Sequence, residues 1–394
     1  MRLRAPAAVA RLLLALAASL LQALTARPLQ ALTARPLQAL TARPLQALTA
    51  RLRLVLAASL LLALTACDQP AEPETPIACA SGSVSGQGSS AQTNAINAWI
   101  KAYQIACADA AVAYTSTGSG AGVKSFIEGT GDFAGTDTPL SAADLRSAAT
   151  RCGGPVVHLP LVVGPIALAY NVAGVGDLRL TPPTIAKIFS GTVTTWNDKA
   201  IATDNPGVVL PSTKISIVHR ADGSGTTANF LRYLTAAAPS DWTHGAGSDW
   251  PLPGGLGQRG SHRVAAAITR TDGAIGYVES SYARVTDLPT VRVGTADGSY
   301  AQPADWAAAQ SIAAAQVTED LRLEIDYTAA TAGAYPIVQV TYELVCRNTI
   351  SDVARSFLVY AAGESGQRAA EQAGYAPLPP ALQARVTATL STLR

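Results

Sequence analysis

Charged residues are scarce in this chain of 394 residues, at 14 %, whereas hydrophobic residues make up 48 %. A chain of this composition can bury a large core, which excludes disorder for most of its length. Acidic residues are absent from positions 1–66, which hold eight arginines. Removing these eight from the 29 lysines and arginines leaves 21 against 27 acidic residues, so the body of the chain carries a net charge of −6. An acidic body argues against a nucleic-acid partner, because affinity for a phosphate backbone comes from clustered basic residues.

Motifs of common catalytic and cofactor sites are also missing. No glycine-rich turn continues into Gly-Lys-Ser or Gly-Lys-Thr, and none matches GxGxxG with a downstream acid, which argues against nucleotide-binding loops. The four histidines, His158, His219, His244 and His262, form no HExxH pattern. We therefore expect no metal site, no cofactor and no enzymatic activity, although a nucleophile and a base far apart in sequence can still meet in space.

Cysteine is rare, and no two cysteines have the CxxC spacing, so neither a zinc site nor a thiol-redox site is indicated. Apart from Cys67, the chain contains Cys79, Cys107, Cys152 and Cys346. An even number of cysteines in an exported protein favours two disulfides, and three pairings are possible. Free buried cysteines are the alternative.

The first 66 residues are predicted to be a signal peptide region. Residues 21–52 contain the octapeptide LQALTARP three times and then LQALTARL. The prolines at eight-residue intervals argue against one long helix. A complete export signal lies within residues 51–67, where two arginines precede an apolar run that is too short to span a bilayer.

This signal ends in Leu64-Thr65-Ala66-Cys67, which resembles the lipobox of bacterial lipoproteins, whose cysteine is acylated and becomes the mature N-terminus. We therefore expect lipidation at Cys67, attachment to the membrane through this lipid anchor, and a tether over residues 67–78. An ordinary secretory signal with an incidental cysteine is the alternative. Asp68 resembles the inner-membrane retention signal of Gram-negative lipoproteins, so the expected location is the periplasmic side of the inner membrane.

From Cys79 onward the pattern of strand, glycine-rich turn and helix recurs. The turns at 86–90, 118–122 and 220–226 are each followed by apolar residues at helical spacing. Alternating units of this kind predict an α/β fold with largely parallel sheets. The apolar stretch 156–170 contains two prolines and a glycine, and is predicted to form two strands or one bent crossing between lobes.

These three turns can also offer free backbone N–H groups at the positive ends of helices. A single turn of this type is typical of a simple helix cap. Three together, with Arg220 beside the third, indicate a buried tetrahedral oxyanion that hydroxyl, amide and guanidinium groups hold as hydrogen-bond donors.

Several segments carry a resemblance to the substrate-binding protein of the phosphate-specific ABC transporter. They are GSGAGV at 118–123, DFAGTDTPLS at 132–141, IFSG at 188–191 with TWND at 195–198, RADGSGT at 220–226, GAIGYVE at 273–279 and APLPP at 376–380. The resemblance runs from about Gly86 to the C-terminus. It implies a two-lobed periplasmic-binding-protein fold of type II, with lobe 1 at 79–163 and 337–394, lobe 2 at 164–336, and the ligand cleft between them.

The resemblance further implies a monomer that binds inorganic phosphate with high affinity and delivers it to the permease and ATPase subunits of an ABC transporter. Matched motif by motif, it implies a phosphate shell made of Ser89, Ser90, Ala91, Ser119, Asp137, Arg220, Ser224, Gly225 and Thr226. The loop Gly260-Ser261-His262 departs from the Gly-Asn-Asp or Gly-Asn-Glu common in the family, so the contacts near this loop stay open.

Asp137 is a hydrogen-bond acceptor beside an expected anion, which makes sense if the ligand retains a proton. Phosphate near neutral pH keeps at least one hydrogen and sulfate keeps none, so a carboxylate pairs with the first and repels the second. The alternative role for Asp137 is a turn residue that caps its own backbone. Asp222 either orients Arg220 or belongs to an Asp-Gly turn. The rival functions are an exported phosphatase-like enzyme, a lipoprotein that binds sulfate or arsenate, and a surface lipoprotein without a transport role.

Overall fold

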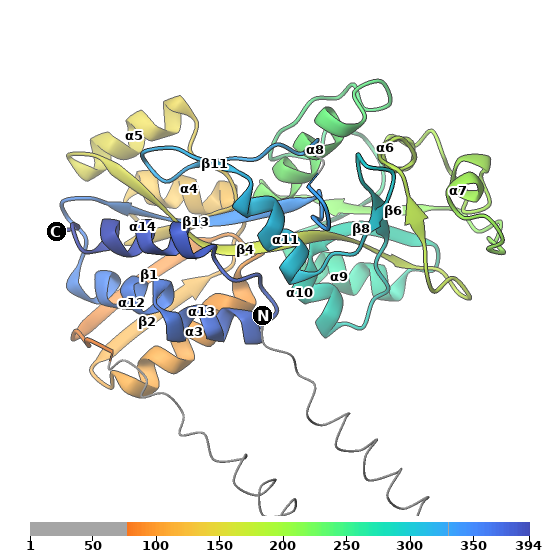
Figure 1. Cartoon of the computed structure of the whole chain (residues 1–394). Coiled ribbons are helices and arrows are strands. Elements are labelled where there is room, and N and C mark those ends of the chain that lie inside the picture. The colour runs from red at the N-terminus through yellow and green to blue at the C-terminus, as the bar shows by residue number, and fades with distance from the viewer. Residues whose placement is uncertain (1–76, 330) are drawn as a thin grey trace, which may run out of the picture. The chain divides into compact units, whose positions relative to one another are not determined.

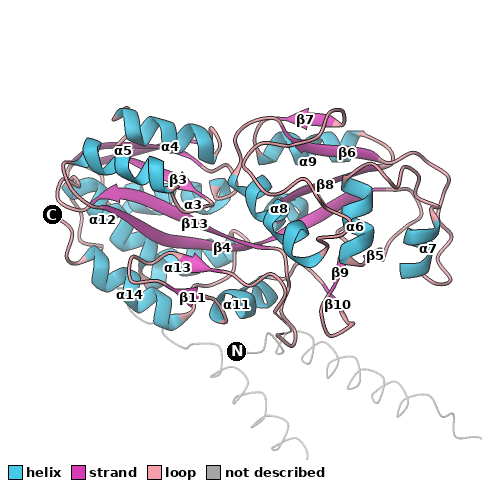
Figure 2. Ribbon diagram, turned by 90° about the horizontal axis from the view of Figure 1, so that it is seen from above, coloured by secondary structure: helices cyan, strands magenta, loops and turns pink. Residues whose placement is uncertain are grey.

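The computed structural model describes residues 77–329 and 331–394. The predicted signal region, the octapeptides, Cys67 and all but the last residues of the tether lie outside the described residues. In the described part, two groups of helices and strands are joined by two long strands, β4 (Val156–Asn171) and β13 (Val338–Cys346) (Figure 1 and Figure 2). We refer to the group that contains residues 82–136 as the first lobe and to the group that contains residues 216–279 as the second lobe.

One sheet of eight strands runs through both lobes in the order β2-β1-β3-β13-β4-β8-β6-β7. Its strands are β1 (Gly82–Gly88), β2 (Ala110–Thr115), β3 (Phe133–Thr136), β4 (Val156–Asn171), β6 (Ser216–Arg220), β7 (Leu256–Gln258), β8 (Ala274–Glu279) and β13 (Val338–Cys346). The pairings are parallel within each flank, β2-β1-β3 and β8-β6-β7. They are antiparallel at the centre, where β13 pairs with β3 and β4, and β4 pairs with β8. The predicted parallel sheets are therefore separated by an antiparallel crossing.

The stretch predicted as two strands or one bent crossing forms a single strand, β4. Its first part, Val156 to Pro165, pairs with β13, and its second part, Ile166 to Asn171, pairs with β8. Fifteen of its 16 residues are buried, which explains why the sequence reads as a continuous apolar run. The predicted lobe boundaries at 163/164 and 336/337 remain predictions, and they fall inside β4 and just before β13.

Helices cover the sheet within each lobe. The first lobe has α3 (Thr93–Ala106), α4 (Ser119–Glu128), α5 (Ala142–Cys152), α12 (Asp352–Ala362), α13 (Glu364–Gln372) and α14 (Pro380–Leu390). The remaining helices are α6 (Pro182–Phe189), α7 (Lys199–Asp204), α8 (Gly225–Ala237), α9 (Ser261–Arg270), α10 (Ser280–Val285) and α11 (Asp305–Ala313). Two small sheets complete the described fold: β5 (Arg179–Leu180), β9 (Arg292–Gly294) and β10 (Tyr300–Ala301), and the pair β11 (Gln316–Val317) and β12 (Leu323–Glu324).

The stripe predicted after the first turn forms α3, and it buries Ile96, Trp99 and Tyr103 against the core. This packing fixes where the preceding turn lies, because the helix begins directly after it. In the described part of the chain, no helix is both long and apolar enough to cross a membrane.

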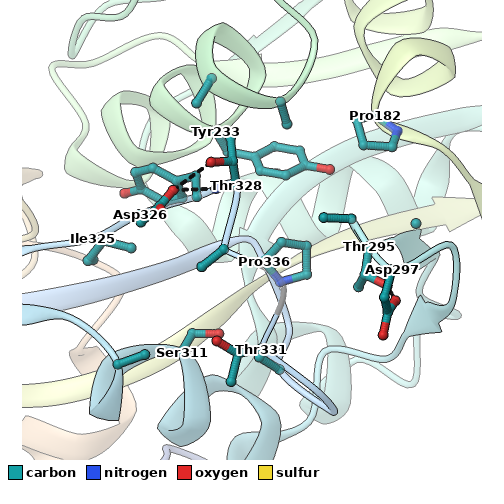
Figure 3. A pocket seen from close by; sticks show the side chains of 18 of the residues that line it. Pro182, Tyr233, Thr295, Asp297, Ser311, Ile325, Asp326, Thr328, Thr331 and Pro336 are labelled. Atoms are coloured by element: carbon teal, nitrogen blue, oxygen red, sulfur yellow. Dashed lines mark hydrogen bonds between the residues drawn. The ribbon is translucent and has the colours of Figure 1, made fainter.

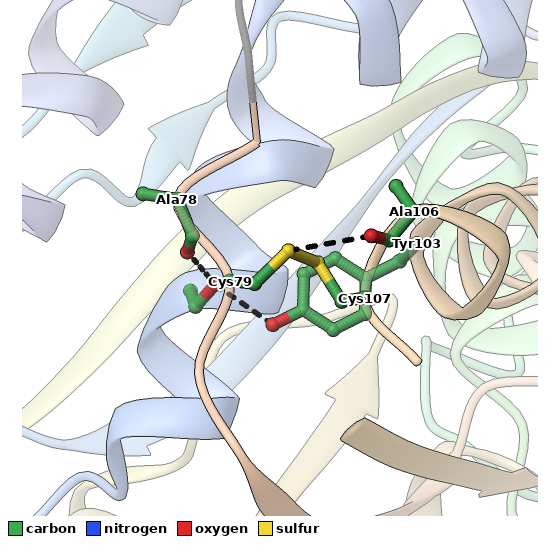
Figure 4. Close-up of a disulfide and its surroundings, with 6 residues drawn as sticks. Ala78, Cys79, Tyr103, Ala106 and Cys107 are labelled. Carbon is green, nitrogen blue, oxygen red and sulfur yellow. Dashed lines mark hydrogen bonds between the residues drawn. A yellow bond between two sulfur atoms is a disulfide. The ribbon is translucent and has the colours of Figure 1, made fainter. Parts of the chain in front are cut away.

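Two disulfides join the four cysteines of the body, so one of the three possible pairings is selected. Cys79 bonds to Cys107 at the end of α3 (Figure 4), across 28 residues of sequence. Cys152 bonds to Cys346, across 194 residues. The second bond joins the segment before β4 to the last residue of β13, at the end of the crossing where Val156 and Cys346 are paired.

Loop length predicts which disulfide stabilises the fold more. The chain-entropy model assigns about 3.5 kcal/mol to a loop of 28 residues and about 5 kcal/mol to one of 194 residues. We expect the pair Cys152→Ser and Cys346→Ser to lower the free energy of unfolding more than the pair Cys79→Ser and Cys107→Ser. Urea unfolding of both double variants measures the difference, and equal losses would contradict the loop-length argument.

Candidate functional site

The predicted site residues come together at the carboxyl ends of parallel strands from both lobes. Ser89 to Ala91 follow β1, Ser119 follows the loop after β2, Asp137 follows β3, and Arg220 ends β6. This edge of an open α/β sheet is where such folds bind ligands, because loops and helix N-termini converge there. All side chains of the set are at most 4 % exposed, so the lobes enclose them.

Two helix N-termini point into this enclosed site. Ser119 is the first residue of α4, and Ser224 caps α8 by accepting a hydrogen bond from the backbone N–H of Thr227 at 3.2 Å. Gly225 and Thr226 follow as the first residues of α8. The free N–H groups of the two helices and their dipoles favour a negative group between them.

Asp137 lies at the centre of the site and binds hydroxyl groups from both lobes. Ser89 Oγ donates to Oδ1 at 2.5 Å, and Ser119 Oγ donates to Oδ2 at 3.3 Å. From the second lobe, Thr226 Oγ1 donates to Oδ2 at 3.3 Å. Thr341 Oγ1, on the crossover strand β13, donates to Oδ1 at 2.8 Å. The carboxyl group thus ties the two lobes and the crossing together.

The electrostatics of Asp137 reflect two opposed effects. Burial raises the pKa of this carboxyl above its ordinary value, since a charge is less stable away from water. The hydrogen bonds from Ser89, Thr341 and Thr226 and the nearby charge of Arg220 oppose the shift. A ligand that donates a further hydrogen bond would stabilise the ionised form in the same way.

Arg220 is held by an acid from the same turn. Its Nε donates to Asp222 Oδ1 at 2.7 Å and its Nη2 donates to Asp222 Oδ2 at 2.5 Å. Asp222 Oδ1 also accepts from the backbone N–H of Gly260 at 3.2 Å. Of the two roles considered for Asp222, orientation of the guanidinium is confirmed. The fork geometry of this pair fixes one edge of the guanidinium plane.

The two lobes are in direct contact at the site, as in a closed cleft. The backbone N–H of Gly120 donates to the carbonyl of Gly223 at 3.0 Å, from one lobe to the other. A Cβ at Gly225 would lie 2.5 Å from Asp137 Cβ and 2.7 Å from Ser119 Oγ. Only glycine lets α8 approach the first lobe this closely.

Ser90 differs from the other predicted hydroxyl donors in its contacts. Its Oγ lies 3.0 Å from Ser261 Oγ and accepts from the Ser261 backbone N–H at 3.0 Å. The loop at 260–262, whose contacts the sequence did not predict, therefore contacts Ser90 across the cleft. Tyr282 donates to the carbonyl of Ser90 at 2.7 Å and Tyr375 donates to the carbonyl of Ala91 at 2.6 Å, so both carbonyls of this turn are fixed.

Two residues of the site were missed by the sequence analysis. Asn229 Nδ2 donates to the carbonyl of Asp137 at 2.7 Å and to that of Gly225 at 2.9 Å. The other is Thr341 of β13, which donates to the Asp137 carboxylate. A signal was present for Thr341, because it, Gln339 and Glu343 are polar residues within an otherwise apolar buried strand, and such residues need partners.

A separate cavity of about 190 Å³ lies behind the site, against the far end of α8. Tyr233 of α8, Pro182, Thr295 and Pro336 surround it (Figure 3). None of the predicted site residues lines this cavity. It is therefore distinct from the enclosed site around Asp137.

Comparison with known proteins places this chain among binding proteins. The family model described as "PBP superfamily domain" matches residues 73–365. The chain is 38 % identical over 316 residues to the phosphate-binding protein PstS 3 of Mycobacterium leprae, covering 78 % of this chain and 85 % of that protein. It is 36 % identical over 315 residues to the phosphate-binding protein PstS of Xylella fastidiosa, covering 77 % and 84 %.

Solved structures show the same fold. A high-affinity periplasmic phosphate-binding protein, solved with phosphate bound, matches with a TM-score of 0.64 and 23 % identity, covering 78 % of this chain and 93 % of that one. A phosphate-binding protein from Stenotrophomonas maltophilia matches with a TM-score of 0.64 and 21 % identity over the same shares. These likenesses establish the two-lobed architecture.

The close approach at Gly225 gives a direct test of the closed site. We expect Gly225→Ala to weaken binding of inorganic phosphate by about tenfold to a hundredfold, because the added methyl group meets Asp137 and Ser119 and overpacking costs about 1 to 3 kcal/mol. Gly223→Ala is the matched control, since its Cβ would meet no atom nearer than 3.4 Å. Isothermal titration of both variants measures the effect, and equal affinities would contradict the closed arrangement.

Proposed function

This chain belongs to the PBP superfamily and to its PstS phosphate-binding proteins, and from this membership we propose that it binds inorganic phosphate outside the cytoplasmic membrane and delivers it to an ABC importer. The observation that carries the proposal is the position of Asp137. Its buried carboxyl group lies where the N-termini of α4 and α8 meet, close to the charge of Arg220. Titration with phosphate and with sulfate tests it, and failure to bind phosphate would overturn it.

The proposed phosphate shell is the set predicted from the sequence. Ser89, Ser90, Ser119, Ser224 and Thr226 offer hydroxyl groups, and the turn at Ala91 and the start of α8 at Gly225 offer backbone N–H groups. Arg220 supplies a guanidinium whose orientation Asp222 fixes. Donors of these three kinds neutralise a tetrahedral oxyanion without a metal ion.

Asp137 is proposed to select for a protonated oxyanion. Its carboxylate accepts a hydrogen bond from the P–O–H of phosphate, while sulfate has no hydrogen to donate and meets only acceptor lone pairs. Sites built on one such bond discriminate by about 10⁴ to 10⁵, because the wrong ligand leaves a buried polar group unpaired. The burial of Asp137 supports this role, since a buried carboxylate oxygen left without a partner is costly.

We propose a binding protein and not an enzyme. Among the described residues, the groups that bond to the Asp137 carboxylate are hydroxyls, and no histidine is among them. A phosphatase assay of the purified protein tests the rival function, and turnover that Ser119→Ala abolishes would favour the enzyme.

The remaining proposals concern location and partners. We propose a lipid-anchored monomer on the periplasmic side of the inner membrane, which hands phosphate to the permease and ATPase subunits of the importer. The lobes at 79–163 with 337–394 and at 164–336 would open and close around the ligand. The predicted lipobox at Cys67 and the predicted tether support the anchor.

Asp137→Asn should reduce the selectivity for phosphate over sulfate more than it reduces the affinity for phosphate. Asparagine keeps one carbonyl acceptor for phosphate and gains an N–H donor for sulfate, so the preference for phosphate over sulfate should fall by about tenfold or more, the value of one charged hydrogen bond. Arg220→Ala is the contrasting variant and should weaken both anions together, because a guanidinium recognises charge and oxygen geometry. Competition titrations measure both affinities in each variant. An unchanged ratio of phosphate affinity to sulfate affinity in Asp137→Asn would refute the role of Asp137 in selectivity.

Mature protein should begin at an acylated Cys67. Mass spectrometry of the membrane fraction should find the lipid on this residue, and Cys67→Ser should release the protein from the membrane while phosphate binding persists. Deleting residues 2–50 should leave export intact, because residues 51–67 contain every part of a signal. A soluble product with an unmodified cysteine would refute the lipid anchor.

A further inference from the structure

Asn229 of α8 is bonded through every polar position of its side-chain amide. Its Nδ2 donates to the carbonyls of Asp137 at 2.7 Å and of Gly225 at 2.9 Å. Its Oδ1 accepts from the Tyr327 hydroxyl at 2.8 Å and from Arg232 Nη1 at 3.4 Å. An amide offers two hydrogens and two lone pairs, so all four are used in a side chain that is only 3 % exposed.

The chemistry of these partners allows one orientation of the amide. The two carbonyls can only accept, and the guanidinium of Arg232 can only donate. If the amide were reversed, its oxygen would face the carbonyls of Asp137 and Gly225, and its NH₂ group would face the guanidinium. Of the two donors to the amide oxygen, the Tyr327 hydroxyl makes the shorter bond. Tyr327 therefore has the main part in orienting the amide.

The bond from Asn229 to Asp137 joins the two lobes. Asn229 belongs to the second lobe and lies one turn after Gly225, the first residue of α8. Asp137 follows β3 in the first lobe, and its backbone N–H donates to Ser119 Oγ at 3.2 Å. Both the N–H and the C=O of Asp137 are thus bonded. These bonds hold its main chain, and with it the carboxylate, in a fixed place relative to the first turn of α8.

Tyr327 reaches Asn229 from a segment that is attached to the first lobe. This segment follows the strand pair β11 and β12, and the backbone N–H of Leu323 in β12 donates to the Tyr342 hydroxyl at 3.0 Å. Tyr342 lies on the part of β13 that pairs with β3. The amide of Asn229 therefore meets groups attached to the first lobe on both sides, the carbonyl of Asp137 at its nitrogen and Tyr327 at its oxygen.

We propose that Asn229 and Tyr327 form a latch between the lobes: the Tyr327 hydroxyl orients the amide of Asn229, and the amide holds the main chain of Asp137 against α8 and slows the release of bound phosphate. The proposal deepens the proposed function and rests on it for the identity of the anion and for the motion of the lobes. Both members of the latch are positioning residues, since they act on phosphate through Asp137 and α8.

The latch should affect the dissociation of phosphate and leave its association unchanged. Phosphate enters while the lobes are apart, and it leaves only after the bond between Asn229 and Asp137 has broken. Asn229→Leu keeps nearly the same shape and removes the donor, so we expect the dissociation rate to rise about tenfold, as for one buried carbonyl left unpaired. Rapid-mixing exchange of radiolabelled phosphate measures both rates. An unchanged dissociation rate, or a change confined to association, would overturn the proposal.

Tyr327→Phe tests the orientation of the amide while the packing of the ring is kept. Loss of the hydroxyl should raise the dissociation rate by about threefold to tenfold, because only the longer bond from Arg232 then remains on the amide oxygen. In the Asn229→Leu background the same change should have no further effect, since the tyrosine acts through the amide. Additive effects of the two substitutions would overturn the proposal.

Tyr233→Phe is the matched control. Tyr233 is also a buried tyrosine and lies on α8 itself, but its hydroxyl has no hydrogen-bond partner among the described residues. Its replacement should leave both rates of phosphate exchange at the wild-type values. A rise in dissociation equal to that of Tyr327→Phe would show that loss of any tyrosine hydroxyl near α8 has this effect, and would overturn the specific role of Tyr327.

A readout that does not depend on phosphate affinity separates this proposal from the proposed function. The side-chain amide hydrogens of Asn229 are bonded to carbonyls, so nuclear magnetic resonance should show slow exchange with water. Tyr327→Phe should speed this exchange in samples with phosphate, without phosphate or both. Equal exchange in wild type and variant in both samples would overturn the latch whether or not phosphate binds. Faster exchange in the variant of a protein that binds no phosphate would support the latch while refuting the proposed function.

Discussion

A buried carboxyl group needs partners, and Asp137 obtains them only when three parts of the fold meet. Ser89 and Ser119 approach from the first lobe, Thr226 from the second and Thr341 from the crossover strand. An unpaired charge at this depth would cost several kcal/mol, so the closed lobes and the register of β13 both depend on this group. The glycine at position 225 follows from the same constraint, because the helix that carries Thr226 must come within van der Waals contact of Asp137.

Three of the four hydroxyl groups that bond to Asp137, those of Ser89, Ser119 and Thr226, are also donors proposed for phosphate. Hydroxyls rotate, so Ser89, Ser119 and Thr226 can turn from the carboxylate to an anion, while a proton on the anion takes their place at Asp137. Arg220 cannot rearrange in this way, because Asp222 holds two of its nitrogens. The site thus combines a fixed cation with adaptable neutral donors, which suits a ligand whose charge and proton count vary with pH.

Local features of the chain were predictable from the sequence, and distant pairings were not. The helical stripe after residue 86 appears as α3. The predicted turns at 118–122 and 220–226 lie at the starts of α4 and α8, but these helices begin earlier than predicted, at Ser119 and Gly225, so the end of each predicted turn is helical. The motifs also brought Asp137 and Arg220 into one predicted site. Thr341 escaped because its contact with Asp137 spans 204 residues and depends on the antiparallel register of β13 against β3, which no local pattern encodes. The disulfide pairing stayed open among three possibilities for the same reason, because it depends on contacts between segments far apart in the chain.

The bond between Cys152 and Cys346 gives the crossing an asymmetric mechanical character. It fastens the outer end of the β4–β13 pair, where Val156 and Cys346 lie opposite each other, while the inner end passes into the second lobe at Pro165 and Ile166 without a covalent tie. Two strands clamped at one end resist shear along the clamped part and bend at the free end. Each opening and closing of the lobes would then bend the same short stretch of backbone near Pro165 and Ile166. The first lobe would stay rigid while the second lobe moves relative to it.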